Sequence, residues 1–195
     1  MMSDLVVHGF ETSNNMKVRV ALGFKQIPYE FRSIDPADRG EILKMSGQHL
    51  TPVMVHDCRV LFDSAAILRY LESNFLDSPR LFGASHKEQW EIEDEELFAR
   101  TTLARPLMDI VHARVHGGSV DRDRCADAFR HAAGRLVRAL EGREWLVGKT
   151  MSAADVTAAA LMYRVRLAGM FDGPPEVQAV DGWVDRVMAY DRYRQ

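Results

Sequence analysis

In the N-terminal part of the chain, short apolar runs alternate with stretches in which apolar residues recur at helical spacing. A short apolar run bounded by turn residues predicts a strand, and helical spacing predicts a helix. Strands are predicted over residues 5–8, 29–31, 53–55 and 60–62, and helices over 16–25, 39–45 and 63–74. The β-α-β-α-β-β-α order, with the last two strands forming a hairpin through Asp57-Cys58, is an α/β pattern.

Turn-forming residues mark a linker after this region, at Asp77-Ser78-Pro79 and Gly83. Everything beyond the linker has a helical pattern. We therefore expect two domains: an α/β domain over residues 1–78 and an all-helical domain over residues 85–195.

Three helical stretches are predicted in the C-terminal part. The first runs from 85 to 116, and Pro106 should kink it rather than end it. The second spans 122–140. The third opens at Ser152, and the spacing from Ser152 to Asp155 is that of a capping box.

Composition narrows the classes of function. The chain has 195 residues, of which 47% are apolar and 27% charged, as in an ordinary globular protein. Its net charge of −3 argues against a dedicated nucleic-acid binder. No apolar run is long enough to span a bilayer, and the N-terminus lacks the basic and apolar regions of a signal peptide. We therefore expect a cytoplasmic protein that has neither nucleic acid nor a membrane as a partner.

Metal and disulfide chemistry are not expected. The cysteines, Cys58 and Cys125, lie far apart and form no Cys-x-x-Cys pair, which suits a reducing compartment. His112 and His116 are one helical turn apart, but Ala113 stands where a His-Glu-x-x-His zinc motif requires glutamate. We therefore predict no metal.

Candidate binding chemistry lies at Asp63-Ser64, where a strand gives way to a helix. The apolar face of this helix is expected to contain Ala66, Ile67, Tyr70 and Leu71. The first N–H groups of a helix carry partial positive charge, so a carboxylate can dock there while Asp63 holds an ammonium group. A γ-glutamyl peptide has both groups. The alternative is that Asp63 or Ser64 only caps the helix.

Pro52 stands at the start of the strand predicted over 53–55. Because proline cannot donate to a sheet ladder, it suits an edge strand or a cis turn. A cis bond would turn the backbone of Val53 outward and leave its N–H and C=O free to pair with an extended peptide.

These segments resemble motifs of the cytosolic glutathione transferase family. Thr51-Pro52-Val53-Met54 is similar to its Thr/Val-Pro-Val/Ala-Leu segment, and residues 63–71 are similar to its Glu/Asp-Ser-x-Ala-Ile-x-x-Tyr-Leu segment. Ser152-Ala153-Ala154-Asp155, after Leu146-Val147-Gly148, is similar to a third segment, in which the aspartate is buried and structural. The resemblance covers nearly the whole chain. It implies a thioredoxin-like N-terminal domain and an all-helical C-terminal domain.

The resemblance places thiol activation in the loop after the first strand. The family lowers the pKa of the glutathione thiol with a Tyr, Ser or Cys at the start of the first helix. Thr12 falls on that position and Ser13 follows it, so both are candidate catalytic residues. Zeta-class members read Ser-Ser-Cys where this chain has Thr12-Ser13-Asn14, so the loop resembles that of a bacterial zeta-like or theta-like protein. The alternative is that these residues only cap the helix.

Glutathione binding is assigned by the same resemblance to His49, Thr51, Val53, Asp63 and Ser64. Residues 48–52 are similar to a Gln-His-Thr-Val-Pro segment of the delta and epsilon classes, in which the histidine approaches the glycyl end of glutathione. The alternative for His49 is an exposed loop histidine that binds nothing.

The implied function is a glutathione transferase involved in detoxification. The thiolate of glutathione, a co-substrate, would attack a small hydrophobic electrophile, and the helical domain would supply the electrophile pocket and the contacts of a homodimer. Met108, Val111, Tyr163 and Met170 are candidates for the pocket, although core packing explains them as well. Two other functions stay open: a glutathione-dependent cis–trans isomerase, and a non-catalytic interaction protein on the same scaffold.

Overall fold

The computed structural model describes residues 5–172 and 174–194, which separate into two compact units. The first unit comprises residues 5–81 together with 188–194, and the second is Phe82–Val187. The end of the chain thus groups with the N-terminal unit, whereas the sequence analysis assigned all of 85–195 to the helical domain. The functional domains over 1–78 and 85–195 stay a prediction.

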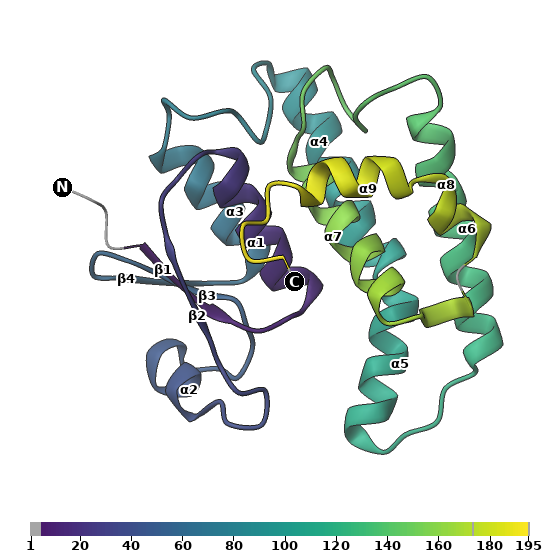
Figure 1. Ribbon diagram of the computed structural model, residues 1–195, viewed down its shortest axis with the longest axis horizontal. Coiled ribbons are helices and arrows are strands. Elements are labelled where there is room, and N and C mark those ends of the chain that lie inside the picture. The colour runs from purple at the N-terminus through teal and green to yellow at the C-terminus, as the bar shows by residue number, and fades with distance from the viewer. Residues whose placement is uncertain (1–4, 173, 195) are drawn as a thin grey trace. The chain divides into compact units, whose positions relative to one another are not determined.

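A four-stranded sheet with the strand order β2-β1-β3-β4 forms the centre of the first unit (Figure 1). Its strands are β1 (Leu5–Gly9), β2 (Glu30–Ser33), β3 (Val53–His56) and β4 (Arg59–Phe62). Its helices are α1 (Ser13–Phe24), α2 (Gly40–Ser46) and α3 (Ser64–Asn74). β1 pairs in parallel with β2 and antiparallel with β3, which pairs antiparallel with β4. This is the thioredoxin-like arrangement that the sequence predicted.

The buried face of α3 differs from the predicted one. Its buried residues are Ser64, Ala65, Ile67, Leu68 and Leu71, and Ala66 is exposed. α3 packs against α1 and β4, so the contact stripe follows the spacing i, i+3, i+4 and i+7 from Ser64. Tyr70 is only half-buried, and its hydroxyl lies 2.7 Å from Nδ1 of His56.

The structure distinguishes between the two possibilities for Pro52, which were an edge strand and a cis turn. The Thr51–Pro52 bond is cis, and β3 lies between β1 and β4 rather than at an edge. Val53 pairs with His8 on one side and Phe62 on the other. The expectations of an edge strand and of a Val53 backbone turned out of the sheet are therefore wrong, because a residue between two strands has its backbone groups directed into the ladder.

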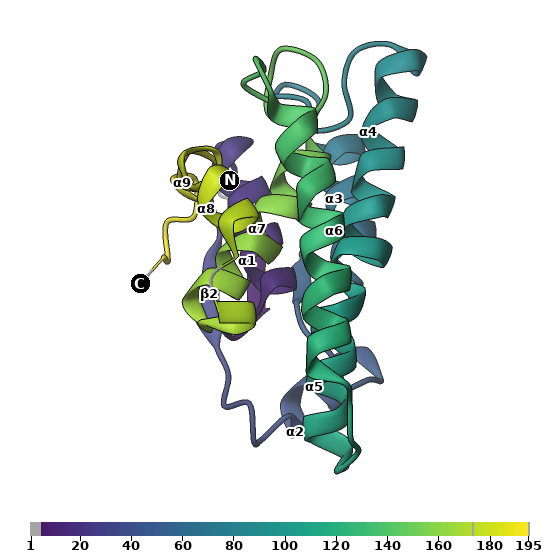
Figure 2. The ribbon, with the colours of Figure 1, turned by 90° about the vertical axis from the view of Figure 1, so that its right-hand side faces the viewer.

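Helices make up the second unit. They are α4 (His86–Phe98), α5 (Arg105–His116), α6 (Arg122–Leu140), α7 (Ala153–Leu167), α8 (Pro175–Ala179) and α9 (Asp181–Met188). α5 and α6 lie side by side (Figure 2). The bounds of α6 are those that the sequence predicted. The sequence analysis did not resolve α8 and α9, which are short and closely spaced.

The predicted helical run from 85 to 116 contains a π-helical segment, Ala99–Leu103, between α4 and α5. The N–H of Ala104 donates to the carbonyl of Ala99 at 3.1 Å, and Pro106 follows in the first turn of α5. Proline has no N–H and its ring clashes with the carbonyl four residues earlier, so a wider turn just before it relieves that conflict. The chain stays helical through this point, as predicted.

Asp155 is fully buried at the start of α7 and accepts four hydrogen bonds. Its Oδ1 accepts from the N–H of Leu146 at 2.8 Å and from Nε1 of Trp183 at 3.1 Å. Its Oδ2 accepts from the N–H and the hydroxyl of Ser152, at 3.0 and 2.9 Å. Burial raises the pKa of Asp155, and these hydrogen bonds oppose that shift. The predicted capping box is present, and Asp155 has a structural environment.

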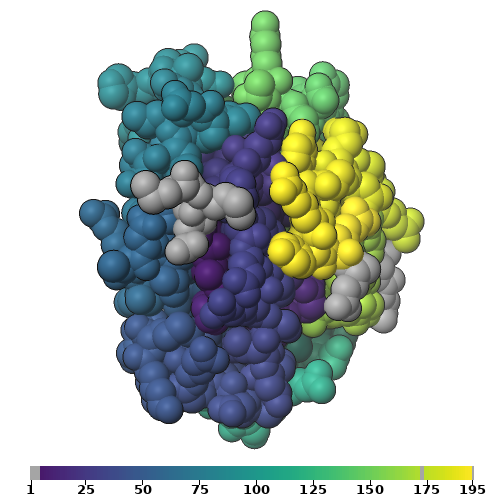
Figure 3. All heavy atoms as spheres, turned by 60° about the vertical axis from the view of Figure 1, so that its left-hand side comes forward, coloured from purple at the N-terminus to yellow at the C-terminus, as the bar shows by residue number. Residues whose placement is uncertain are grey.

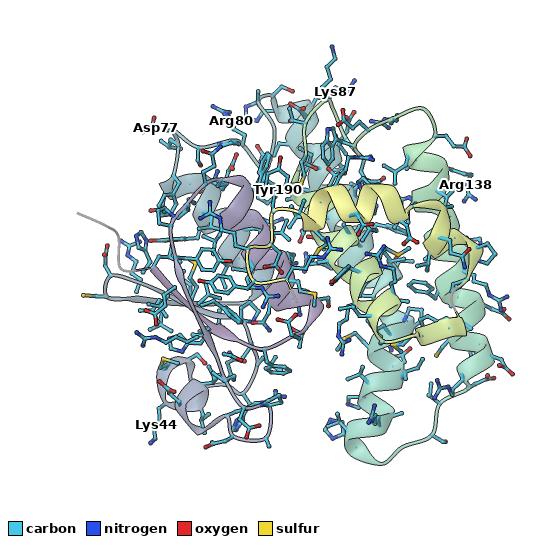
Figure 4. All side chains as sticks on the ribbon, in the orientation of Figure 1. Lys44, Asp77, Arg80, Lys87, Arg138 and Tyr190 are labelled. Carbon is cyan, nitrogen blue, oxygen red and sulfur yellow. The ribbon has the colours of Figure 1, made fainter. Side chains whose placement is uncertain are left out.

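Residues 188–194 pack on α1 within the first unit, and Figure 3 shows the end of the chain in yellow against purple and blue residues of that unit. Asp191 accepts from Nε and a terminal nitrogen of Arg19 at 3.1 and 2.8 Å, and both side chains are buried. The ring of Tyr190, labelled in Figure 4, stands edge-on to Phe24 with centroids 5.5 Å apart. A Cβ on Gly23 would lie 1.9 Å from the carbonyl oxygen of Tyr190, so this close approach requires glycine.

Within residues 5–172 and 174–194, no helix is long and apolar enough to cross a membrane. Across the same ranges, no group of three or more His, Cys, Asp or Glu side chains is placed to hold a metal ion. The rings of His112 and His116 stack on α5 with centroids 4.3 Å apart.

Candidate functional site

The first part of the site is the start of α1, which Thr12 caps. The hydroxyl oxygen of Thr12 accepts from the backbone N–H of Asn15 at 3.3 Å and from Nδ2 of Asn15 at 2.7 Å. A hydroxyl has two acceptor lone pairs and one proton, so with both lone pairs engaged the Thr12 O–H is left to donate. The capping role therefore exists at Thr12 and leaves its proton available. Ser13 is the first residue of the helix and is half-buried.

Asn15, which the sequence analysis missed, connects Thr12 to Thr51. Its side chain is fully buried, and Nδ2 also donates to the Thr51 hydroxyl at 2.9 Å. A Cβ on Gly9 would lie 1.7 Å from Oδ1 of Asn15, so Gly9 provides the space for this amide. A polar side chain directly before Met16, where the predicted helix over 16–25 begins, was the available signal. We call Thr12, Asn15 and Thr51 the hydroxyl cluster.

The start of α3 forms the second part of the site. Asp63 caps the helix with Oδ1 alone, which accepts from the N–H groups of Ala65 and Ala66 at 3.0 and 2.9 Å. Its side chain is exposed, and its φ of 66° is a conformation that Asp tolerates better than most residues. Ser64 is buried, and its hydroxyl donates to Oδ1 of Asn14 at 3.3 Å. The starts of α1 and α3 therefore meet through Asn14 and Ser64.

His49 is bonded through its backbone to Arg39, and to neither of the two helix starts described above. Its side chain is exposed, and its carbonyl accepts from a terminal nitrogen of Arg39 at 3.0 Å. The guanidinium carbon of Arg39 lies 4.9 Å from the centroid of the Phe10 ring, in the loop after β1. No sequence motif indicated Arg39, because its cation is brought to this loop by the fold.

The site thus has two helix N-termini, the hydroxyl proton of Thr12 and the Asp63 oxygen that is not used for capping. The N-termini favour anions. The second oxygen of Asp63 suits an ammonium group, and the Thr12 proton suits an anionic atom near the start of α1. Val53 contributes a buried side chain next to Thr51–Pro52. The arrangement suits a zwitterionic ligand that carries an additional anionic atom.

The four residues that were candidates for the electrophile pocket lie in three different environments. Met108 and Val111 are exposed on α5, with 54% and 42% of their side chains accessible. Tyr163 is buried in α7, which favours the core-packing alternative for that residue. Met170 is half-buried in a short 3₁₀ turn, Met170–Asp172.

Comparison with known proteins finds similarity to glutathione S-transferases. The family described as glutathione S-transferase, N-terminal domain, matches residues 7–79. The chain is 24% identical over 190 residues to glutathione S-transferase U7 of Arabidopsis thaliana, with 90% of this chain and 78% of that protein covered. It is 25% identical over 180 residues to a probable maleylacetoacetate isomerase of Vibrio cholerae, with 83% and 81% covered.

A solved structure has the same fold along the chain. It is a glutathione S-transferase of Methylobacterium radiotolerans in complex with glutathione sulfonate, with a TM-score of 0.78 and 18% identity, and 98% of this chain and 91% of that one are covered. At this identity the likeness concerns the fold. Together, these comparisons show that residues 7–79 are similar to the N-terminal domain of glutathione S-transferases, and that the chain is similar to named glutathione S-transferases and to a probable isomerase over most of its length.

Proposed function

We propose that the first unit binds glutathione at the starts of α1 and α3, and that the protein is a glutathione transferase. The γ-glutamyl ammonium binds the Asp63 oxygen that does not cap α3, and the γ-glutamyl carboxylate binds the backbone N–H of Ser64 at the start of α3. The observation that carries this proposal is that both capping bonds of Asp63 fall on Oδ1. The glutathione sulfonate bound to the relative from Methylobacterium radiotolerans supports the ligand class.

The cysteinyl part of glutathione then lies near Thr51, and its sulfur lies at the start of α1. Thr12 is the better candidate for thiol activation because its hydroxyl accepts two hydrogen bonds and retains one proton to donate. A hydrogen bond donated to a thiolate stabilises it and lowers the thiol pKa. The thiolate then attacks a small hydrophobic electrophile.

The glycyl carboxylate is assigned to the side of the site where His49 lies. Arg39 holds the His49 carbonyl and stacks on Phe10, so it brings a fixed positive charge to the same loop. We therefore propose Arg39 beside His49 as a group that attracts this carboxylate. Val53 keeps a packing role in our proposal, because its backbone is part of the sheet.

The central test is the pH dependence of thiolate absorbance in the complex with glutathione. Thr12→Val preserves the shape and removes the donor, so it should raise the apparent pKa of the bound thiol by about one unit, which corresponds to about 1.4 kcal/mol. Binding of glutathione should persist. Ser13→Ala is the matched control and should change the pKa less. If neither variant shifts the pH titration of thiolate absorbance, the proposal that a hydroxyl activates the thiol is wrong.

A second candidate reaction is glutathione-dependent cis–trans isomerisation. It is favoured by the similarity to a protein named probable maleylacetoacetate isomerase. Conjugation consumes glutathione and isomerisation does not, so stoichiometry separates them. Incubation with an activated chloroarene, and separately with maleylacetoacetate, followed by measurement of free thiol distinguishes the two reactions. A wild-type protein that binds glutathione without forming thiolate near neutral pH favours a non-catalytic interaction protein.

We further propose a homodimer and a cytoplasmic location, with the electrophile bound by the helical unit. Exposed apolar side chains on α4 and α5 support an interface or a binding surface there: Trp90, Leu97, Met108, Val111 and Val115. Light scattering coupled to size-exclusion chromatography tests the dimer. A monomeric mass across micromolar concentrations contradicts it.

A further inference from the structure

We propose that Asn15 is a positioning residue that locks the Thr12 hydroxyl as a hydrogen-bond donor. The inference rests on the proposed function, because the acceptor of that proton is the sulfur of bound glutathione. It adds a residue that the sequence motifs do not indicate.

The NH₂ group of the Asn15 carboxamide donates both of its protons within the hydroxyl cluster. The structure directs Nδ2 to Thr12 at 2.7 Å and to Thr51 at 2.9 Å. Since the side chain is fully buried, solvent does not compete for these bonds.

These bonds affect the Thr12 hydroxyl. Its oxygen accepts from the Asn15 side chain and from the Asn15 backbone N–H. A free hydroxyl rotates between donating and accepting roles, but a hydroxyl with both lone pairs occupied has only its proton left to offer. Accepted hydrogen bonds also polarise the O–H and strengthen its donation. Threonine, whose methyl group restricts the rotamer, is thereby held in one orientation.

The Asn15 side chain is itself held in place by its surroundings. Thr51 accepts the second Nδ2 proton from the other side, and Gly9 leaves the space that Oδ1 occupies. The Nδ2 group of the carboxamide is therefore hydrogen-bonded to Thr12 after β1 and to Thr51 before β3, while Oδ1 is buried beside Gly9 without a hydrogen-bond partner among the described residues. This arrangement makes the donor role of Thr12 a property of the ligand-free protein.

The test uses the thiolate titration as a double-mutant cycle. Asn15→Leu keeps a similar volume and removes the carboxamide. It should therefore raise the pKa of the bound glutathione thiol, and this rise should be most of the one that Thr12→Val causes. In the Thr12→Val background, Asn15→Leu should add no further shift, because the hydroxyl through which it acts is gone. Additive shifts would overturn the proposal. Asn74→Leu, which removes an exposed amide at the far end of α3, is the control for the thiol pKa, and an equal shift there would also overturn the proposal.

A measurement on the ligand-free wild-type protein keeps the proposal testable if Asn15→Leu does not fold. Both side-chain amide protons of Asn15 should exchange slowly with solvent in NMR spectra, and those of exposed Asn14 should exchange fast. In Thr12→Val, one Asn15 proton should exchange faster. Fast exchange of the Asn15 amide protons together with normal thiolate formation overturns the positioning role of Asn15 and does not contradict the proposed function. Slow exchange with no thiolate overturns the proposed function and leaves the positioning role of Asn15 supported.

Discussion

Asp63 combines two roles in one side chain, because one oxygen caps α3 and the other is exposed beside the helix start. Asp63→Asn keeps an oxygen for the cap and removes the charge that is proposed to hold the γ-glutamyl ammonium. Glutathione affinity should fall by roughly 1.5–3 kcal/mol, the scale of a charge-assisted hydrogen bond. Titration calorimetry measures this loss, and a thermal melt should show little change. Unchanged affinity contradicts the assignment of Asp63.

His8 should give the protein a stability that depends on pH. Burial lowers the pKa of His8, which is 4% exposed in β1. Because the folded pKa lies below the unfolded value of about 6.5, the stabilisation is present above pH 6.5 and is lost as pH falls toward the folded pKa. Urea midpoints measured at decreasing pH from 7.5 should fall, and the fall should be smaller in His8→Met. Equal slopes in the two proteins contradict the prediction.

At the scale of elements, the start of α7 is held by a buried carboxylate whose partners come from two other segments. Leu146 lies before the helix and Trp183 lies in α9, and both donate to Oδ1 of Asp155. The carboxylate therefore ties three parts of the second unit together. This exceeds the capping box that the sequence predicted, because Trp183 is far away along the chain.

Asp155→Ala should lower the free energy of unfolding by roughly 3–7 kcal/mol. The loss of the cap costs about 1 kcal/mol, and each buried donor left without a partner adds about 1–3 kcal/mol. Urea unfolding measures the total. Asp155→Asn keeps one acceptor oxygen and should cost less. Glutathione affinity of the folded fraction should stay nearly unchanged, and a melt like that of the wild type contradicts the prediction.

At the scale of the whole molecule, the last residues of the chain complete the first unit. The Arg19–Asp191 pair and the approach of Tyr190 to Gly23 fasten the segment 188–194 to α1. Glu11 also bonds to Arg19, so this buried guanidinium is bound by two carboxylates. The end of the chain thus packs beside the same helix whose N-terminus carries the candidate catalytic residues.

The sign of the stability change caused by Gly23→Ala tests this packing. In an ordinary helix, replacing glycine by alanine stabilises by roughly 0.5–1 kcal/mol. Here the added Cβ would lie 1.9 Å from the Tyr190 carbonyl, so the full-length variant should be destabilised. In a chain truncated after residue 187, the same change should be neutral or stabilising. Chemical unfolding of the four proteins measures this reversal, and the same sign in both backgrounds would contradict the docking of the segment.

Local sequence patterns were enough to predict the order of elements, the thioredoxin-like and helical parts, the capping box at Ser152 and the motifs around Thr51-Pro52 and Asp63-Ser64. These features depend on local periodicity, turn residues and caps, which act over a few neighbouring residues. The position of Thr12 at a helix start was predicted for the same reason.

The side chains that meet in the folded protein could not be predicted in this way. The tertiary structure placed Asn15 between Thr12 and Thr51, brought Arg39 to Phe10, paired Val53 on both sides and returned residues 188–194 to α1. Each of these contacts joins segments that are separated along the chain, or depends on space that a glycine leaves in another element. Local pattern carries no information on such pairings, because they follow from how the faces of different elements pack together.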